Sequence, residues 1–451
     1  MSAPVKAGKP AGTFHGGVHP PDRKELSKEA AIRALEAPEV LRIPLLQHLG
    51  APCKAVVKAR DQVEAGALLG EAGGFVSAPV HAPLGGKVTR FTGVTLPNGR
   101  RVPAVPVKVE DGGPRGGELL EDCFGGEWPY VEGPDGPAQE EILRAAREGG
   151  LVGMGGAAFP THVKLSPPEG KRIDTLVVNG CECEPYLTSD HRLMVEYPRP
   201  IWAGALLAAR AVGADRVVLG LEDNKPEAFH SLSDNLPSSK AEIVLLKTRY
   251  PQGGERQLIQ AALGRIVPTG GLPLDVGVVV LNVGTAAALA RAFFRGKPLT
   301  HRVVTVTGRG IARPGNLLVP VGAPYRDLIE ACGGLLPEAE RIVSGGPMMG
   351  FTVGDLDTPV TKGTSGITVL TSEETGRGRR TECVRCGRCV EVCPLRLVPT
   401  RIALAARRRN WDVARRYHIQ ACIECGSCAY VCPAAIPLTQ LIRMGKAMLP
   451  R

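Results

Sequence analysis

Residues 383–394, CVRCGRCVEVCP, and residues 422–433, CIECGSCAYVCP, share one cysteine spacing, C-x2-C-x2-C-x3-C-P. This is the ligand pattern of paired [4Fe–4S] clusters, in which two intervening residues let successive thiolates converge on one cluster. Zinc sites usually take two separated C-x2-C pairs, whereas two identical runs that each end in proline fit iron–sulfur clusters better than zinc or disulfides. The repeat therefore predicts a protein that carries electrons.

The two runs are expected to share their ligands. In paired clusters of this type, the fourth cysteine of each run binds the cluster of the other run. We therefore predict one cluster held by Cys383, Cys386, Cys389 and Cys432, and a second held by Cys422, Cys425, Cys428 and Cys393. Replacing Cys393 should then damage the cluster that the second run builds.

Length and cysteine use limit the class of protein. A chain of 451 residues with 43% apolar content should form three or four domains with real cores. Of the 13 cysteines, the five outside the two runs are scattered, which indicates reduced thiols and a cytoplasmic compartment. No stretch approaches the roughly 18 consecutive apolar residues of a spanning helix, and the first residues do not resemble a signal peptide. We expect a chain without a transmembrane segment, which other subunits would hold at a membrane.

Positive charge is concentrated around the predicted clusters. The formal net charge is +10, and 12 arginines lie between Arg377 and Arg416. Aromatic residues make up only 4% of the chain, so a role in nucleic-acid binding is not expected. The charge instead predicts an acidic redox partner or a neighbouring subunit.

The N-terminal part, residues 1–111, is predicted to be an arm followed by a small β module. The first thirty residues are rich in Gly, Pro, His and Lys and should be loose or ordered only by docking. Short apolar runs between Gly and Pro turns follow and resemble the biotinyl/lipoyl barrel-sandwich fold. The turn at residues 75–80, FVSAPV, has no Lys to carry a prosthetic group, so we expect a structural module or a docking surface.

The rest of the chain predicts a multidomain α/β and α+β protein. Residues 112–137 form a Gly/Pro-rich linker, residues 138–299 a Rossmann-like domain, residues 300–365 a β-grasp unit, and residues 366–451 a helical ferredoxin-like domain for two [4Fe–4S] clusters. In the second of these regions, strand-like runs at 173–178, 216–221, 242–247 and 276–281 alternate with helical patterns at 201–212, 226–235, 254–263 and 285–294. This alternation predicts a mostly parallel sheet that binds ligands beyond the carboxyl ends of its strands.

A glycine-rich loop, residues 149–161 (GGLVGMGGAAFPT), opens the α/β region. Glycines allow positive φ and let backbone N–H groups approach a phosphate. The loop matches neither G-x-G-x-x-G nor a Walker loop, so its spacing alone leaves a phosphate site and an ordinary turn equally open. Beside two clusters, a flavin is expected, because it converts two-electron chemistry into single electrons.

Four ordered motifs carry a family resemblance. Residues 153–164, with Gly153-x-Gly155-Gly156-Ala157-x-Phe159-Pro160-Thr161-x2-Lys164, resemble the FMN loop of the NADH-binding flavoprotein subunit of respiratory complex I. Residues 179–185 (NGCECEP), 250–255 (YPQGGE) and 282–285 (NVGT) follow in the same order. The β module, the two cysteine runs, HGGVHPP at 15–21 and SGGPMMG at 344–350 resemble the C subunit of the Rnf (Rsx) ion-translocating electron transport complex over essentially the whole chain.

The resemblance implies non-covalent FMN, NAD(H) as substrate, and a β-grasp unit of the SLBB type. It implies phosphate and ribityl contacts from Gly153, Gly155, Gly156 and Ala157 with Lys164 as charge partner, flavin contacts from Asn179, Glu182, Asn282 and Thr285, nicotinamide neighbours Glu184 and Glu255, and Phe159 on the adenine. Two positions depart from the pattern. Cys181 is a thiol where an acidic contact is expected, and Gly254 leaves Glu255 as the remaining member of an acidic pair.

The resemblance also implies a function. It implies the peripheral electron-input subunit of a membrane ferredoxin:NAD oxidoreductase on the cytoplasmic face of the bacterial inner membrane, with no catalytic acid, base or nucleophile. An iron–sulfur subunit of that membrane complex would exchange electrons with it, and ferredoxin would be an indirect partner. Two alternatives stay open at this point: a soluble flavin/iron–sulfur reductase such as a microcompartment cobalamin reductase, and a relay adaptor with a vestigial flavin site.

Overall fold

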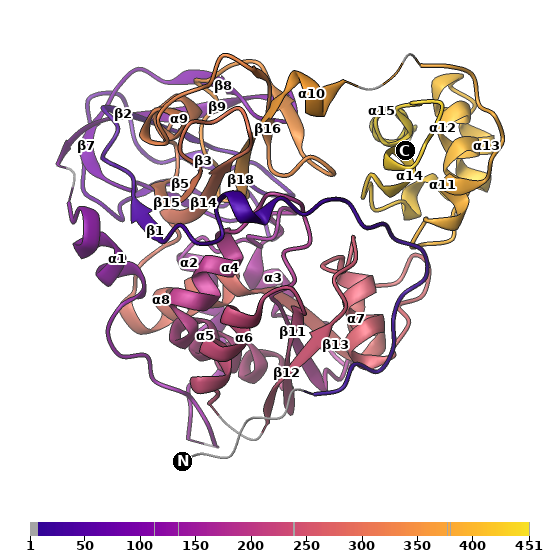
Figure 1. Cartoon of the computed structure of the whole chain (residues 1–451). Coiled ribbons are helices and arrows are strands. Elements are labelled where there is room, and N and C mark those ends of the chain that lie inside the picture. The colour runs from indigo at the N-terminus through magenta and orange to yellow at the C-terminus, as the bar shows by residue number, and fades with distance from the viewer. Residues whose placement is uncertain are drawn as a thin grey trace.

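The computed structural model describes residues 8–111, 113–133, 135–237, 240–376, 378 and 380–450. Residues 1–7 of the predicted arm, residues 112 and 134 of the predicted linker, and Arg377 and Arg379 of the arginine-rich segment lie outside this description. A β module, an α/β region, a second β-rich unit and a helical C-terminal region follow one another along the chain (Figure 1). This order agrees with the predicted fold class.

The β module consists of short antiparallel strands in two sheets. One sheet has the order β2-β9-β7-β4 with β8 on β9, and the other has the order β3-β5-β6. The strands are β2 (Val40–Pro44), β3 (Lys54–Ala55), β4 (Gln62–Val63), β5 (Leu68–Glu71), β6 (Val80–His81), β7 (Gly85–Val88), β8 (Thr92–Thr95) and β9 (Arg101–Asp111). Alternate apolar side chains such as Val105 and Val107 on β9 are fully buried, as expected for strands with one face on a core.

The α/β region contains the predicted parallel sheet. Its order is β12-β11-β10-β13, and all three strand pairs are parallel. The strands are β10 (Thr175–Asn179), β11 (Arg216–Glu222), β12 (Ala241–Leu246) and β13 (Val278–Asn282). The helices are α2 (Gln139–Glu148), α3 (Thr161–Lys164), α4 (Ser189–Glu196), α5 (Pro198–Val212), α6 (Pro226–Asp234), α7 (Glu255–Leu263) and α8 (Val283–Arg295), with a 3-10 turn η2 (Pro273–Val276). Parallel strands with crossover helices place their carboxyl ends at one edge.

The segment predicted as a Gly/Pro linker contains a helix, α1 (Gly116–Phe124). Leu119 and Cys123 of this helix are buried, and so is Trp128 just after it. The guanidinium of Arg295 lies 3.9 Å from the centroid of the Trp128 ring. The Gly and Pro content suggested a featureless connection, but a few apolar residues with partners on α8 are enough to order a short helix.

The second β-rich unit draws strands from outside its predicted limits. Its sheet has the order β1-β15-β14-β18-β16-β17. The elements are β1 (Ile32–Ala34), β14 (His301–Thr307), β15 (Gly315–Pro320), α9 (Tyr325–Ala331), β16 (Ala339–Ser344), β17 (Phe351–Val353) and β18 (Gly366–Thr371). β1 covers the edge of β15 by parallel pairing, and β18 lies beyond the predicted boundary at 365. The domain boundaries themselves stay predictions.

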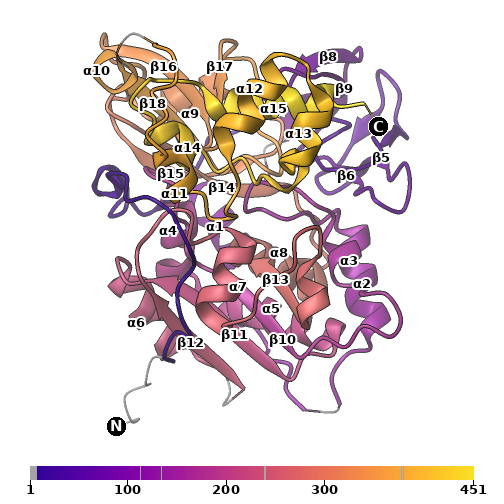
Figure 2. The same ribbon diagram turned by 90° about the vertical axis from the view of Figure 1, so that its right-hand side faces the viewer.

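The arm, expected to be loose or ordered only by docking, is docked on its own chain from residue 8 onward. Gly8 bridges to Val244, and Val18 exchanges two backbone hydrogen bonds of 2.8 and 2.9 Å with Tyr250. Phe14 is buried beneath the guanidinium of Arg249. Figure 2 shows the arm passing from β12 along α7 towards the C-terminal region, before the short turn η1 (Lys24–Leu26). The arm therefore ties distant parts of the chain together.

The C-terminal region is made of short helices. They are α10 (Ser372–Thr375), α11 (Arg388–Glu391), α12 (Pro399–Arg407), α13 (Trp411–Arg416), η3 (Ile419–Ala421), α14 (Ser427–Tyr430) and α15 (Leu438–Met448). Figure 1 shows α11 to α15 as one body beside the rest of the molecule. Among the helices of the described residues, none has the length and apolar character needed to cross a membrane.

Candidate electron-transfer site

Two asparagines end neighbouring strands at the carboxyl edge of the parallel sheet. Asn179 ends β10, Asn282 ends β13, and their Cα atoms are partners in the register of the two strands. The sequence motifs that contain them are about a hundred residues apart, so only the parallel pairing brings them together. This edge is where a ligand of such a sheet is expected.

The glycine-rich loop folds back as a narrow hairpin over this edge. Gly153 N–H donates to Phe159 O at 2.8 Å, and Met154 N–H donates to the hydroxyl of Thr285 at 2.9 Å. The tip of the hairpin, Gly155, Gly156 and Ala157, is exposed. A Cβ on Gly155 would stand 3.5 Å from the Cβ of Asn282, and Gly156 has φ +107°. The tip therefore offers bare backbone next to Asn282.

Asn282 caps helix α8. Its side-chain oxygen accepts from Gly284 N–H at 2.9 Å and Thr285 N–H at 3.3 Å, and its amide nitrogen donates to Asp190 at 2.6 Å. Burial raises the pKa of Asp190 to about 7, and the neighbouring Glu182 carboxylate acts in the same direction. Asn282 therefore has a structural role as the cap of this helix, while its predicted flavin contact stays a prediction.

Lys164 and Glu255, predicted for different parts of the ligand, form an ion pair. Lys164 Nζ lies 2.7 Å from Glu255 Oε1 and also donates to Val280 O at 2.9 Å. Lys164 ends the short helix α3 after the glycine loop, and Glu255 begins α7. Both side chains are about one third exposed, so a phosphate or a nucleotide can reach them.

The other two predicted carboxylates point inward. Glu182 accepts hydrogen bonds from the backbone N–H groups of Asp190 and His191, at 2.7 and 3.1 Å, at the start of α4. Glu184 accepts from Met348 N–H at 3.2 Å and Met349 N–H at 2.7 Å. Burial raises the pKa of Glu184 to about 7, and the two N–H donors oppose that shift. Both carboxylates fix the surroundings of the edge, and their predicted contacts with flavin and nicotinamide stay predictions.

The residues at the edge fit a bound FMN. Exposed glycine backbone, the amino end of α8 and Lys164 suit a phosphate. The amide side chain of Asn179, which donates to Gly253 O at 2.8 Å, is fixed close to the thiols of Cys181 and Cys183. A Cβ on Gly253 would stand 3.2 Å from Cys183 Sγ. The space beside Gly253 is thus bounded by Asn179 and Cys183, which hydrogen bonds to Gly253 hold in place.

In the C-terminal region, one cavity is lined by Cys393, Cys422, Cys425 and Cys428. These are the four thiols of the second predicted ligand set, and Cys393 comes from the other run. Leu397 N–H donates to Cys393 Sγ and Glu424 N–H donates to Cys422 Sγ, each at 3.3 Å. Hydrogen bonds of this kind tune the potential of a cluster. The cavity supports crossed ligation on the side of the second run.

The first set is more open. Cys386 is exposed, Cys383 and Cys432 are half-buried, and Cys389 is buried. Cys389 belongs to the buried core of the helical region, and Cys383 and Cys432 pack against that core. Among the described residues, no three His, Cys, Asp or Glu side chains converge on a single metal ion. A [4Fe–4S] cluster does not require such convergence, because its four thiolates bind four different irons.

One loop connects the sheet edge to the second cysteine run. The Tyr250 hydroxyl donates to Cys425 O at 2.6 Å, while Gly253 of the same loop contacts Asn179 and donates its N–H to Cys183 Sγ at 3.2 Å. A Cβ on Gly426 would stand 2.6 Å from Met348 O. The sequence placed Tyr250 in a motif but gave no sign of its contact with Cys425.

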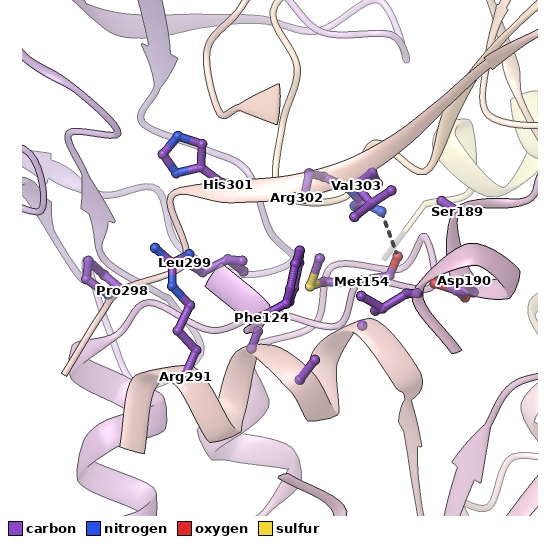
Figure 3. Close-up of a pocket in the computed structure, with 14 residues that line it drawn as sticks. Phe124, Met154, Ser189, Asp190, Arg291, Pro298, Leu299, His301, Arg302 and Val303 are labelled. Carbon is purple, nitrogen blue, oxygen red and sulfur yellow. Dashed lines mark hydrogen bonds between the residues drawn. The ribbon is translucent and has the colours of Figure 1, made fainter. Parts of the chain in front are cut away.

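A small cavity lies behind the glycine loop, between α1, α4, α8 and β14 (Figure 3). Buried Arg302 donates to Met154 O at 3.4 Å, and Asp190 lines the same cavity. Arg302 therefore supports the loop from its inner side. Sequence reasoning identified neither Arg302 nor Asp190, because each acquires its position only from the packing of β14 and α4 against the loop.

The fold and the site define a flavin- and iron–sulfur-containing electron-transfer protein. Four family profiles match in the observed order: the RnfC barrel sandwich hybrid domain over residues 12–112, the Nuo51 FMN-binding domain over 146–291, the SLBB domain over 303–352 and the 4Fe-4S dicluster domain over 380–436. The order agrees with the β module, sheet, second β unit and helices of the structure.

Three relatives are similar over most of the chain. The C subunit of the Na(+)-translocating ferredoxin:NAD(+) oxidoreductase complex of Acetobacterium woodii is 44% identical over 89% of this chain and 89% of its own length. The C subunit of the proton-translocating complex of Clostridium ljungdahlii is 40% identical over 89% and 86%. The C subunit of the ion-translocating oxidoreductase complex of Rhodobacter capsulatus is 40% identical over 86% and 73%. The chain belongs to the family of C subunits of ion-translocating ferredoxin:NAD oxidoreductase complexes.

Proposed function

We propose that this chain exchanges electrons with NAD(H) at the carboxyl edge of its parallel sheet and passes them to a membrane subunit that carries an iron–sulfur cluster. The family shows an electron-input subunit with FMN and two [4Fe–4S] clusters. The proposal adds the residues that hold these groups, the side of the membrane on which the chain lies, and the partner. FMN supplies the change from hydride transfer to single electrons.

The loop of residues 250–255 carries the proposal. At one end, Glu255 pairs with Lys164 and Gly253 contacts Asn179. At the other end, Tyr250 donates to the backbone of Cys425, a predicted cluster ligand. Because electron transfer slows steeply with distance, a site of hydride chemistry must adjoin its first acceptor. This loop brings the two sets of predicted ligands side by side.

The protein's contribution is position and environment. The glycine hairpin, Asn282 and Lys164 bind and orient the flavin, while Glu184 and Tyr250 hold the neighbouring units against the sheet edge. N–H donors to Cys393 and Cys422 adjust the second cluster. No residue of this chain needs to act as acid, base or nucleophile for such a reaction.

The surface of the first cysteine run supports a docking site for the membrane partner. Cys386 is exposed between exposed Arg385 and Arg388, and Val384 beside them is 64% exposed. Further exposed arginines in the segment are Arg380, Arg396, Arg401, Arg407, Arg408, Arg409, Arg415 and Arg416. An acidic surface on an iron–sulfur subunit would be attracted to this face. Ferredoxin would then exchange electrons with this chain indirectly, through that iron–sulfur subunit.

We place the chain on the cytoplasmic face of the bacterial inner membrane. None of the 13 cysteines is in a disulfide, which suits a reducing compartment. Its relatives are subunits of ion-translocating complexes, which favours a peripheral subunit over a soluble cobalamin reductase.

The test is anaerobic addition of NADH to the full chain reconstituted with FMN, iron and sulfide. Bleaching of the flavin absorbance followed by an electron paramagnetic resonance signal from reduced clusters is expected. A protein that holds both clusters, yet shows neither bleaching nor cluster reduction, would be a relay adaptor instead. Reduction of the clusters by dithionite controls for their integrity.

A further inference from the structure

The turn that joins β5 to β6 in the β module docks beside the glycine loop. The His162 imidazole, on α3 directly after the loop, donates from Nε2 to Phe75 O at 3.1 Å. Leu49 N–H donates to Ala158 O at 3.2 Å. Lys362 bridges the two regions by donating to Pro79 O and Gly150 O, each at 2.7 Å. Figure 2 shows β5 and β6 close to α3. The β module therefore borders the predicted nucleotide site.

The turn is rigidly supported. His48 donates from Nδ1 to Leu49 O and accepts Ala78 N–H on Nε2, both at 3.1 Å. Ala51 N–H donates to Val76 O at 3.0 Å. Gly50 has φ +113°, and a Cβ there would stand 2.0 Å from Val76 O, so only glycine allows this approach. The backbone that carries Phe75 is thus held in place by hydrogen bonds before any ligand arrives.

Two large apolar side chains nevertheless stay in solvent on this support. Phe75 is 67% exposed and Leu49 is 57% exposed. The Phe75 ring meets His162 edge-on, with ring centroids 6.1 Å apart and an interplanar angle of 87°. Leu49 contacts Ala158, which follows the exposed tip of the glycine hairpin in the chain. Phe159, the next residue, is half-buried, and its predicted contact with the adenine stays a prediction. A rigid turn that presents an aromatic face beside a nucleotide site is typical of a base-stacking position.

We propose that Phe75 stacks on the adenine of NAD(H), so that the β module completes the dinucleotide site of the α/β region. The inference rests on the proposed function, because it names the part of the same substrate that this face takes. With the nicotinamide at the sheet edge, the dinucleotide has to extend past the glycine hairpin, and its adenosine end reaches the α3 side where Phe75 and Leu49 stand. The turn carries no Lys for a prosthetic group, and its exposed aromatic ring is explained by this contact.

Binding measurements on the reconstituted full chain test the proposal. Phe75→Ala should weaken the binding of ADP-ribose roughly tenfold in titration calorimetry. Binding of nicotinamide mononucleotide should not change, because it lacks adenine. Phe75→Trp should restore ADP-ribose binding. Phe91→Ala is the matched control, since Phe91 is 38% exposed on the same β module, and it should bind both ligands as the wild type does.

Kinetics give a second readout. The KM for NADH should rise in Phe75→Ala, while kcat, the FMN content and the reaction with reduced nicotinamide mononucleotide stay unchanged. Equal ADP-ribose affinity in Phe75→Ala and the wild type would overturn the inference and leave Phe75 as a contact for another protein. If the wild type reacts with neither NADH nor the reduced mononucleotide, the proposed function fails, and this inference fails with it.

Discussion

The two cysteine runs have the same spacing but different surroundings. Cys425 of the second run is 8% exposed, lines a cavity with three other thiols, and receives the Tyr250 hydroxyl on its carbonyl. Cys386, at the same place in the first run, is exposed among arginines. The same local motif thus occurs in two settings, one against the loop of residues 250–255 and one facing the solvent. The neighbours of each run, not its spacing, make the difference.

The largest expected effect comes from removing one cysteine ligand at a time from the two runs. Cys393→Ser should reduce the iron content to about half and remove the same resonance signal that Cys422→Ser removes, because both line one cavity. Cys432→Ser should instead remove the signal that Cys386→Ser removes. The signals are recorded after dithionite reduction. Loss of the Cys386 signal in Cys393→Ser would show that each run binds its own cluster.

The next largest effect should be a loss of FMN from the sheet edge that leaves the clusters of both cysteine runs in place. Lys164→Glu places a second carboxylate beside Glu255 and repels a phosphate, so FMN binding should fall tenfold or more. Both clusters should stay intact in iron analysis. Lys171→Glu is the control, because Lys171 forms a similar 2.7 Å pair with Asp275 on a more exposed surface. Retained flavin in Lys164→Glu would refute the assignment of Lys164.

A smaller effect tests the link between the edge and the second run. Tyr250→Phe removes the hydroxyl that donates to Cys425 O and should destabilise the contact by about 1–2 kcal/mol. Stopped-flow reduction of the clusters by NADH should slow several-fold, with flavin bleaching unchanged. Tyr430→Phe is the control, because Tyr430 lies in the same helical region and is 40% exposed. It should leave the rates of flavin bleaching and cluster reduction unchanged. Equal cluster reduction in all three proteins would remove Tyr250 from the transfer route.

The last effect is a pH dependence of the free energy of unfolding at Glu184. Burial raises its pKa from 4.5 to about 7, so the folded state holds a proton that the unfolded chain has released in this range. Its contribution to stability is therefore present below about pH 4.5 and is lost as pH rises through 7, by about 1 kcal/mol per pH unit between them. Glu184→Gln should flatten this slope in urea unfolding followed by the fluorescence of buried Trp202. An unchanged slope would show that Glu184 stays ionised.

Much of the fold was predictable from periodicity. The four strands of the parallel sheet and the helices α5, α6, α7 and α8 were expected within a few residues, because buried β-branched runs alternate with amphipathic helices. Helices α3 and α4 were not expected. The helix α1 was not expected, since its apolar residues are few and find their partners on β1 and α8, which are distant in the sequence. The sequence left the arm either loose or ordered by docking and did not identify its partners, because its pairing with Val244 and Tyr250 uses backbone groups that carry no sequence signal.

The candidate site shows the same division. The motifs identified Lys164, Asn179, Asn282 and Thr285, and the structure brings all of them to one edge. The motifs did not predict that Glu182 and Glu184 would be engaged by backbone N–H donors, nor that Asp190 would meet Asn282. Contacts of that kind join residues from separate motifs, and their partners are set by packing.

By itself, the sequence determined two runs of thiols with cluster spacing, a glycine-rich loop, and the order of four modules. These features depend on local spacing and backbone freedom, which a few neighbouring residues specify. Only the tertiary structure decided that the second run adjoins the candidate flavin edge through Tyr250, and that Phe75 of the β module contacts His162 beside the glycine-rich loop. Such contacts arise from long-range packing, because residues as far apart as 75 and 162 become neighbours only when their domains dock.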